Sequence, residues 1–176
     1  MKIKRKTNKA KNFLEYLHHS LINYKLLRKN TFNKKEEDIQ RELRHCFYDI
    51  LRKYFQDQGY KDFDKKADDS FYWEGEERKY KSKKVETFAS RSYPDFIITE
   101  PYKMAIEYKK SKNGSIVKEG IGQSLIHTKG GEFDFVYCLI QDESKSKKIV
   151  ESLKNKKETN LKEWLFSNYN IKLEII

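Results

Sequence analysis

Residues 93–111 read YPDFIITEPYKMAIEYKKS and contain the clearest fold signal in the chain. On the two sides of a Glu-Pro-Tyr reversal, one set of residues alternates with another, which is typical of two half-buried strands joined as a hairpin. The apolar set is Phe96, Ile98, Met104 and Ile106, and it alternates with Asp95, Ile97, Ala105 and Glu107. If the reversal uses residues 100–102, Asp95 lies opposite Glu107, and directly opposed residues have Cβ atoms about 4.5–5.5 Å apart. Lys109 follows Glu107 by two residues and is therefore expected on the same face.

Two opposed carboxylates repel each other at neutral pH unless a cation lies between them. Mg²⁺ or Mn²⁺, which prefer oxygen ligands, suit Asp95 and Glu107. Such an ion would hold a scissile phosphate and activate water, while the Lys109 ammonium would stabilise the charge that grows in the transition state. The pattern therefore predicts metal-dependent phosphodiester hydrolysis.

The spacing of these residues resembles the central motif of the PD-(D/E)xK nuclease superfamily. The matching residues are Pro94-Asp95 and, after eleven intervening residues, Glu107-Tyr108-Lys109. Its members include restriction endonucleases, archaeal Holliday junction resolvases and transposon-end nucleases. The resemblance implies an α/β fold with a restriction-endonuclease-like αβββαβ core, a mixed central sheet flanked by helices. It also implies Mg²⁺-dependent cleavage of DNA, with Asp95, Glu107 and Lys109 as the catalytic set.

The segments after the hairpin follow the order that this core requires. Residues 116–128 have helical spacing and precede Gly130-Gly131, and residues 133–140 form an apolar run expected of a strand buried on both faces. Gln123 stands where several nuclease families of this fold carry a glutamine that positions the metal water or the phosphate. The RecB-like form of that motif is Q-x-x-x-Y, from which His127 departs, and an exposed helix glutamine is the alternative interpretation.

The segment before the hairpin contains an amphipathic helix over residues 35–58, closed by Gly59. In this superfamily that helix often supplies a further acid. At 100° per residue, Glu42 lies at the edge of the apolar stripe, Glu36 lies on it and Glu37 points away. We predict Glu42 as the additional catalytic and metal-binding residue, with Glu36 as the other candidate and a solvated surface role as the alternative.

The remaining elements have weaker signals. Strands are expected near residues 71–73 and 85–88, one of which should be the first strand of the meander. Residues 146–154 and 161–167 have helical patterns, and residues 171–176 alternate like a last strand.

The formal net charge is +11, and residues 1–35 carry +10 of it, from eleven Lys or Arg against Glu15. We therefore divide the chain into residues 1–34, a basic arm with an extra amphipathic helix over residues 13–27, and residues 35–176, a nuclease domain. The arm would neutralise DNA phosphates without reading sequence, although a solubilising tail is the alternative. Its candidate DNA-binding residues are Lys2, Lys4, Arg5, Lys6, Lys9 and Lys11. A second basic cluster around Tyr80 could line the same groove or decorate a loop, and it comprises Arg78, Lys79, Lys81, Lys83 and Lys84.

Other classes of site have little support. Cys46 and Cys138 fit core positions better than a disulfide or zinc site, and the four histidines show no metal-ligand spacing. No run is long enough to span a membrane, no apolar signal core follows the basic start, and no G-x-x-x-x-G-K-[ST] motif occurs. We expect an intracellular, cytoplasmic protein with no nucleotide cofactor.

These observations predict a Mg²⁺-dependent DNA endonuclease of the junction-resolving, restriction-like or mobile-element type. Paired cuts by a small single-domain enzyme would call for a homodimer. A catalytically idle nucleic-acid-binding module, a subunit of a larger DNA-processing complex, and a basic RNA-binding or ribosome-associated protein are the alternatives. Dependence on a divalent metal separates the nuclease from these.

Overall fold

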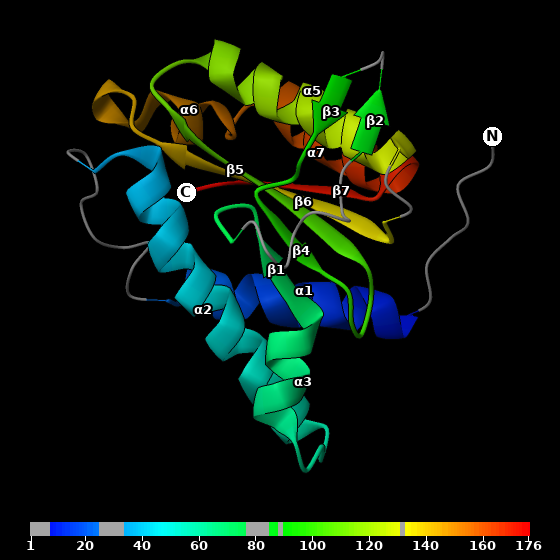
Figure 1. The fold of residues 1–176 in the computed structure, drawn as a ribbon. Helices are drawn as coiled ribbons and strands as arrows, with labels where there is room; N and C mark the ends of the chain where they lie inside the picture. The colour runs from blue at the N-terminus through cyan, green and yellow to red at the C-terminus, as the bar shows by residue number, and fades with distance from the viewer. Residues whose placement is uncertain (1–7, 25–33, 77–84, 88–89, 131–132) are drawn as a thin grey trace.

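The computed structural model describes residues 8–24, 34–76, 85–87, 90–130 and 133–176 of the chain. It is an α/β fold in which an open, mixed five-stranded sheet lies between two layers of helices (Figure 1). The strand order is β1-β4-β5-β6-β7. The strands comprise β1 (Phe71–Trp73), β4 (Phe96–Ile98), β5 (Met104–Ser111), β6 (Phe135–Asp142) and β7 (Ile171–Ile175).

The hairpin of β4 and β5 pairs antiparallel, with Phe96 opposite Ile106 and Ile98 opposite Met104. This is the register that a three-residue reversal predicts. Phe96, Ile98, Met104 and Ile106 are buried in one hydrophobic core, whereas Ala105 packs into the core on the opposite face. The alternation read from the sequence therefore separates the two faces correctly.

The second half of the sheet is parallel, because β5 pairs with β6 and β6 with β7 in the same direction. Every residue of β6 is buried, so the prediction of a strand covered on both faces is confirmed, with bounds about two residues later than expected. β7 coincides with the expected last strand.

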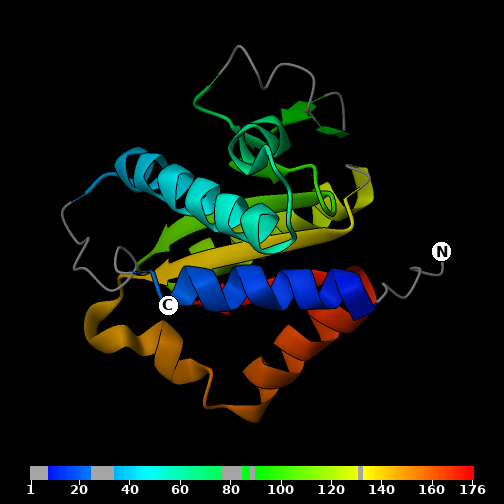
Figure 2. The ribbon, with the colours of Figure 1, turned by 90° about the horizontal axis from the view of Figure 1, so that it is seen from below.

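One face of the sheet is covered by α1 (Asn8–Ile22) and α2 (Glu36–Asp57), which lie side by side over it (Figure 2). α2 confirms the helix expected over residues 35–58. α1 begins five residues before the expected start, and residues 25–27 of that prediction lie outside the described chain. Its buried residues pack into the same core as the sheet, and the Tyr137 hydroxyl of β6 bonds His18 Nδ1 at 2.8 Å.

The other face is covered by α5 (Gly114–Gly130), the short α6 (Lys148–Ser152) and α7 (Lys156–Tyr169). A 3₁₀ turn, η2 (Lys145–Lys147), leads into α6. The helices expected at residues 116–128, 146–154 and 161–167 are therefore present, each with shifted ends. Asn155 caps α7 by accepting a hydrogen bond from the amide of Lys157.

The region between α2 and the hairpin holds α3 (Phe63–Ser70), which the sequence did not reveal, and then β1. β1 pairs antiparallel with β4, so it is the first strand of the meander. The strand expected near residue 85 forms instead a separate two-stranded ladder of β2 (Val85–Thr87) and β3 (Ser90–Ser92).

Two further expectations concern composition. Cys46 on α2 and Cys138 on β6 are both fully buried, which agrees with their prediction as core residues. Among the described helices, none has the length and apolar character needed to cross a bilayer.

Candidate active site

The β4–β5 hairpin brings the predicted carboxylates together. Asp95 directly precedes β4, and the observed register places it opposite Glu107 on β5. Both are removed from water, with exposed fractions of 6% for Asp95 and 2% for Glu107. Two acidic side chains are rarely this buried without a compensating charge or function.

Asp95 is held by two donors. Its Oδ2 accepts a hydrogen bond of 2.7 Å from the backbone amide of Tyr108, and its Oδ1 accepts one of 2.9 Å from Gln40 Nε2 on α2. Burial, followed by repulsion from Glu107, nevertheless raises the pKa of Asp95 to about 8. Without a cation, the folded protein therefore keeps Asp95 largely protonated at neutral pH.

Glu107 contacts a positive or polar group through each oxygen. Lys109 Nζ lies 3.1 Å from Oε1, and His127 Nε2 lies 3.2 Å from Oε2. Burial alone would lower the pKa of Lys109, but the carboxylates of Glu107 and Asp95 outweigh it and shift that pKa upward. Lys109 is therefore a charged ammonium beside the carboxylate pair.

α2 supplies a further acid to this cluster, and it is Glu36 rather than the predicted Glu42. Glu36 Oε2 accepts a hydrogen bond of 3.1 Å from the backbone amide of Lys110, and Oε1 lies 4.0 Å from Lys109 Nζ. Glu42 lies nearly two turns after Glu36 and forms an ion pair with Lys34. Glu36 shares one face of α2 with Gln40, the residue that bonds Asp95, whereas Glu42 lies about 120° away around the helix axis.

α5 faces the cluster from the other side. His127 is completely buried and its Nδ1 has no hydrogen-bond partner among the described residues. Gln123, one turn earlier, likewise has a buried Oε1 that finds no hydrogen-bond partner in the part of the chain that the structure describes. The sequence reasoning singled out Gln123 but assigned no role to His127, although the i, i+4 spacing places both on one helix face.

Gly120 explains how closely α5 approaches the sheet. A Cβ at this position would lie 3.1 Å from Ile140 Cδ1 and 3.4 Å from both Cys138 Sγ and Lys109 Cγ. A side chain here would therefore require Ile140 or α5 itself to shift by a few tenths of an ångström.

Glu74 is a second residue that the sequence did not point to. It follows β1, and its backbone amide donates a hydrogen bond of 3.0 Å to the carbonyl of Asp95. Its side chain is exposed, but partial desolvation, and then the charge of Glu107, raise the pKa of its carboxyl group. Glu74 thus borders the cluster and increases its negative potential.

The carboxylates of Asp95 and Glu107 could supply only part of the ligand shell of a hard divalent cation. Within the described residues, no three His, Cys, Asp or Glu side chains gather into a metal-holding group. Mg²⁺ characteristically uses one or two protein carboxylates and completes its shell with water and substrate phosphate. A carboxylate oxygen has two lone pairs, and among the described residues each oxygen of Asp95 and Glu107 contacts one donor. Asp95 and Glu107 could therefore share such an ion.

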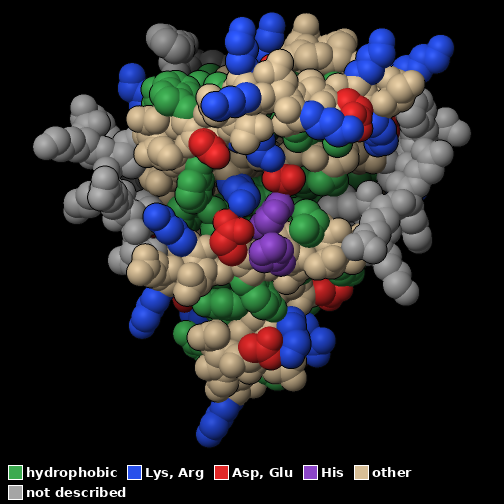
Figure 3. Space-filling view, turned by 180° about the vertical axis from the view of Figure 1, so that it is seen from behind, with side chains coloured by type: hydrophobic (Ala, Val, Ile, Leu, Met, Phe, Trp, Pro, Cys, Tyr) green, Lys and Arg blue, Asp and Glu red, His purple; other side chains and the backbone are tan. Residues whose placement is uncertain are grey.

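The predicted DNA-binding residues are only partly described. Lys9 and Lys11 lie exposed on α1. Seen from behind, lysine and arginine side chains are scattered over the surface with acidic ones among them, rather than gathered in a single patch (Figure 3). Outside the described residues lie Lys2, Lys4, Arg5, Lys6, Arg78, Lys79, Lys81, Lys83 and Lys84.

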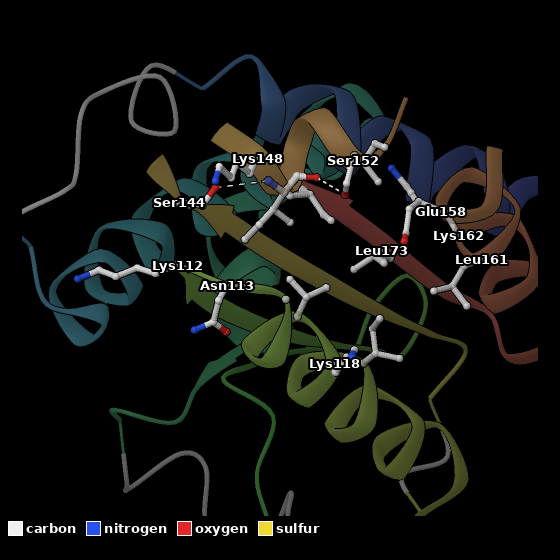
Figure 4. A pocket seen from close by; sticks show the side chains of 16 residues that line it. Lys112, Asn113, Lys118, Ser144, Lys148, Ser152, Glu158, Leu161, Lys162 and Leu173 are labelled. Carbon is white, nitrogen blue, oxygen red and sulfur yellow. Dashed lines mark hydrogen bonds between the residues drawn. The ribbon is translucent and has the colours of Figure 1, made fainter. Parts of the chain in front are cut away.

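A pocket of about 520 Å³ lies away from the carboxylates, between α5, α6, α7 and β7. Its walls are largely aliphatic, including Ile121, Leu153 and Leu173, with lysines such as Lys118 and Lys148 at its rim (Figure 4). Glu158 is the acidic residue in its lining. Because this pocket lacks paired catalytic groups, we place the candidate chemistry at Asp95, Glu107 and Lys109.

Comparisons of the chain with protein-family models, with curated proteins and with solved structures found no match.

Proposed function

We propose that this protein is a Mg²⁺-dependent DNA endonuclease that hydrolyses phosphodiester bonds. Its catalytic residues would be Asp95, Glu107 and Lys109. The observation that carries the proposal is the buried, directly opposed pair of carboxylates with an ammonium 3.1 Å from one of them. Burying two acids next to each other costs free energy, so a fold needs a reason to keep them. Binding a divalent cation is such a reason.

The roles follow from the contacts. Asp95 and Glu107 would bind Mg²⁺, which supplies Lewis-acid activation of the phosphate and lowers the pKa of bound water. Lys109 is positioned to stabilise the negative charge that develops on the phosphoryl group. Glu36 holds the Lys110 amide and lies near Lys109, and His127 fixes the orientation of Glu107.

The order of elements also supports a restriction-endonuclease-like core. Taken in chain order, α2, β1, β4, β5, α5 and β6 give the αβββαβ sequence, with three strands in an antiparallel meander and β6 parallel to β5. α3 and the β2–β3 ladder would then be insertions, and α1 an N-terminal addition.

The test is cleavage of supercoiled plasmid and of a labelled four-way DNA junction in Mg²⁺, Mn²⁺ or EDTA. We expect cutting with either metal, none in EDTA, and a loss of at least about 100-fold in Asp95→Asn and in Lys109→Ala. Glu37→Gln and Lys129→Ala, which change exposed charges on α2 and α5, serve as matched controls. Equal activity of wild type and Asp95→Asn would refute the proposal.

A catalytically idle DNA-binding module is the second candidate. The observation that favours it is that all four oxygens of Asp95 and Glu107 already contact protein donors, so the pair is also partly neutralised without a metal. Titration calorimetry with Mg²⁺ separates the two functions. The nuclease requires metal binding that Asp95→Asn weakens, whereas the idle module requires none.

Paired cuts in a duplex or a junction need two such sites, so the active form is proposed to be a homodimer. Sedimentation analysis of the free protein and of its DNA complex tests this, and a one-to-one complex that cuts both strands at once would contradict it.

A further inference from the structure

A pocket of about 340 Å³ opens beside the candidate active site, between the start of α2 and the turn that joins β5 to α5. Its lining is dominated by lysine, a composition that differs from the aliphatic walls of the larger pocket. The lining residues are Lys34, Lys35, Glu36, Lys110, Lys112, Ile116 and Glu143.

The lining of this lysine pocket carries more positive than negative charge. Four lysines face two carboxylates, which leaves a net charge of +2 in the lining. Lys110 Nζ lies 3.0 Å from Glu143 Oε1, and both side chains are largely buried. Lys35 and Lys112 are exposed, and neither forms an ion pair with a described residue. These two ammonium groups are therefore available to an anion that enters the pocket.

The lysine pocket and the catalytic cluster share a wall. Glu36 lines the pocket, and its carboxylate accepts the hydrogen bond from the Lys110 amide while lying 4.0 Å from Lys109 Nζ. Lys110 is the direct neighbour of Lys109 on β5. Because successive residues of a strand point to opposite sides, one short segment presents one lysine to the carboxylates and the next to the pocket.

We infer that the lysine pocket binds backbone phosphates of the DNA strand that is cut, next to the scissile phosphate at Lys109. This inference rests on the proposed nuclease function for the position of the cut, but the binding itself needs no metal. Lysine ammonium groups neutralise phosphates without reading sequence, so the pocket positions the strand and does not select bases. Phosphates recur about every 3.4 Å of helix axis along one strand, so a strand held at Lys109 carries further phosphates toward Lys35 and Lys112.

The test measures DNA affinity as a function of KCl concentration in EDTA, with a labelled junction and a linear duplex as probes. The variant is Lys35→Ala/Lys112→Ala. The matched control, Lys61→Ala/Lys65→Ala, removes the same charge from exposed positions near the far end of α2. That helix of 22 residues separates the two pairs by roughly 30 Å. Circular dichroism and thermal unfolding check that both variants are folded.

We expect the pocket variant to bind DNA more weakly and to reduce the slope of log K against log [salt] by about 1.8, from two phosphate contacts at about 0.9 each. The control should change the slope by much less. In Mg²⁺, the pocket variant should raise KM with little change in kcat, since it loses contacts made equally in the ground and transition states.

Equal slopes for the two variants, or wild-type protein that does not bind DNA in EDTA, would overturn the inference. The proposed function fails on a different result, namely the absence of metal-dependent cutting by the wild type. A protein that binds DNA through the lysine pocket but never cuts it would retain the inference about phosphate binding and lose the nuclease.

Discussion

Asp95 lies in a setting where its charge is costly until a cation arrives. Burial and the neighbouring Glu107 raise its pKa, while the Tyr108 amide opposes that shift by donating to the carboxylate. Metal binding at this site should therefore displace a proton, and the affinity for Mg²⁺ should rise with pH.

The same group makes stability depend on pH. The folded protein keeps the Asp95 proton up to about pH 8, whereas an unfolded aspartate loses it near pH 3.9. The folded state therefore binds the extra proton between these values, and the free energy of unfolding of the metal-free protein falls as pH rises through that window. We expect Asp95→Asn to abolish this contribution, whose limiting slope is about 1.4 kcal/mol per pH unit.

Urea unfolding in EDTA across this pH range measures the difference between wild type and Asp95→Asn. Asp38→Asn, at an exposed position of α2, is the matched control and should run parallel to the wild type. Parallel curves for Asp95→Asn as well would show that the Asp95 carboxyl is not perturbed by the fold.

His127 is expected to matter for activity because it holds one oxygen of Glu107 at 3.2 Å. His127→Ala leaves that buried oxygen without its partner, and we expect about a 10–100-fold loss of Mg²⁺ affinity or cleavage rate. His127→Gln keeps a donor and should recover a large part of it. His45→Ala, on the exposed surface of α2, should have no effect. Full activity of His127→Ala in a Mg²⁺ titration of cleavage would remove this residue from the site.

At the level of elements, the position of α5 against the sheet controls the geometry around Lys109. Gly120→Val should destabilise the protein by about 1–3 kcal/mol, because its side chain would overlap Ile140 and press on Lys109. Gly122→Val is the matched control on the same helix, since a Cβ there meets nothing within 4 Å. Thermal unfolding of the two variants measures the difference, and equal melting temperatures would contradict the close packing of α5.

The strands and the long helices could be predicted because their burial follows a simple period. β4 and β5 alternate between two faces, so counting through the reversal placed Asp95 opposite Glu107. α3 gave no such signal, since only Ala67 and Ser70 of its eight residues are buried and packing against α2 stabilises it. The start of α1 was missed for a related reason: before Phe13, only Ala10 faces the core.

The acid from α2 could not be chosen from sequence alone. Glu36 and Glu42 both lie near the apolar stripe, and helical periodicity fixes only their angle around the axis. Which of them meets Lys109 depends on where α2 crosses β5, a tertiary property that the local pattern does not contain. The role of His127 could not be predicted for a different reason. A lone buried histidine has no local sequence signature, and its partner Glu107 is known only from the three-dimensional structure.

For the whole molecule, α1 belongs to the core of the fold. Phe13, Leu14, Leu17 and Leu21 are at most 1% exposed and pack in the core that also contains β4 and β5. Fully burying four such side chains contributes about 6–12 kcal/mol, comparable with the total stability of a typical domain.

A chain that starts at residue 35 should therefore lack a cooperative unfolding transition. Removing only residues 1–7, which precede α1, is the control and should leave the transition in place. Circular dichroism during urea unfolding distinguishes the two truncations. A cooperative transition with wild-type midpoint in the shorter chain would mean that α1 is dispensable for the fold.

The hydrogen bond between His18 and Tyr137 joins positions 119 residues apart. At synthesis rates of about 5–20 residues per second, the ribosome needs about 6–24 s to add the strand that receives α1. During that interval α2 and then β4 and β5 become available to cover the leucines of α1, but β6 does not. The nascent chain therefore carries α1 without its complete core through most of its synthesis, an interval in which chaperones can bind the part of its apolar face that is still uncovered.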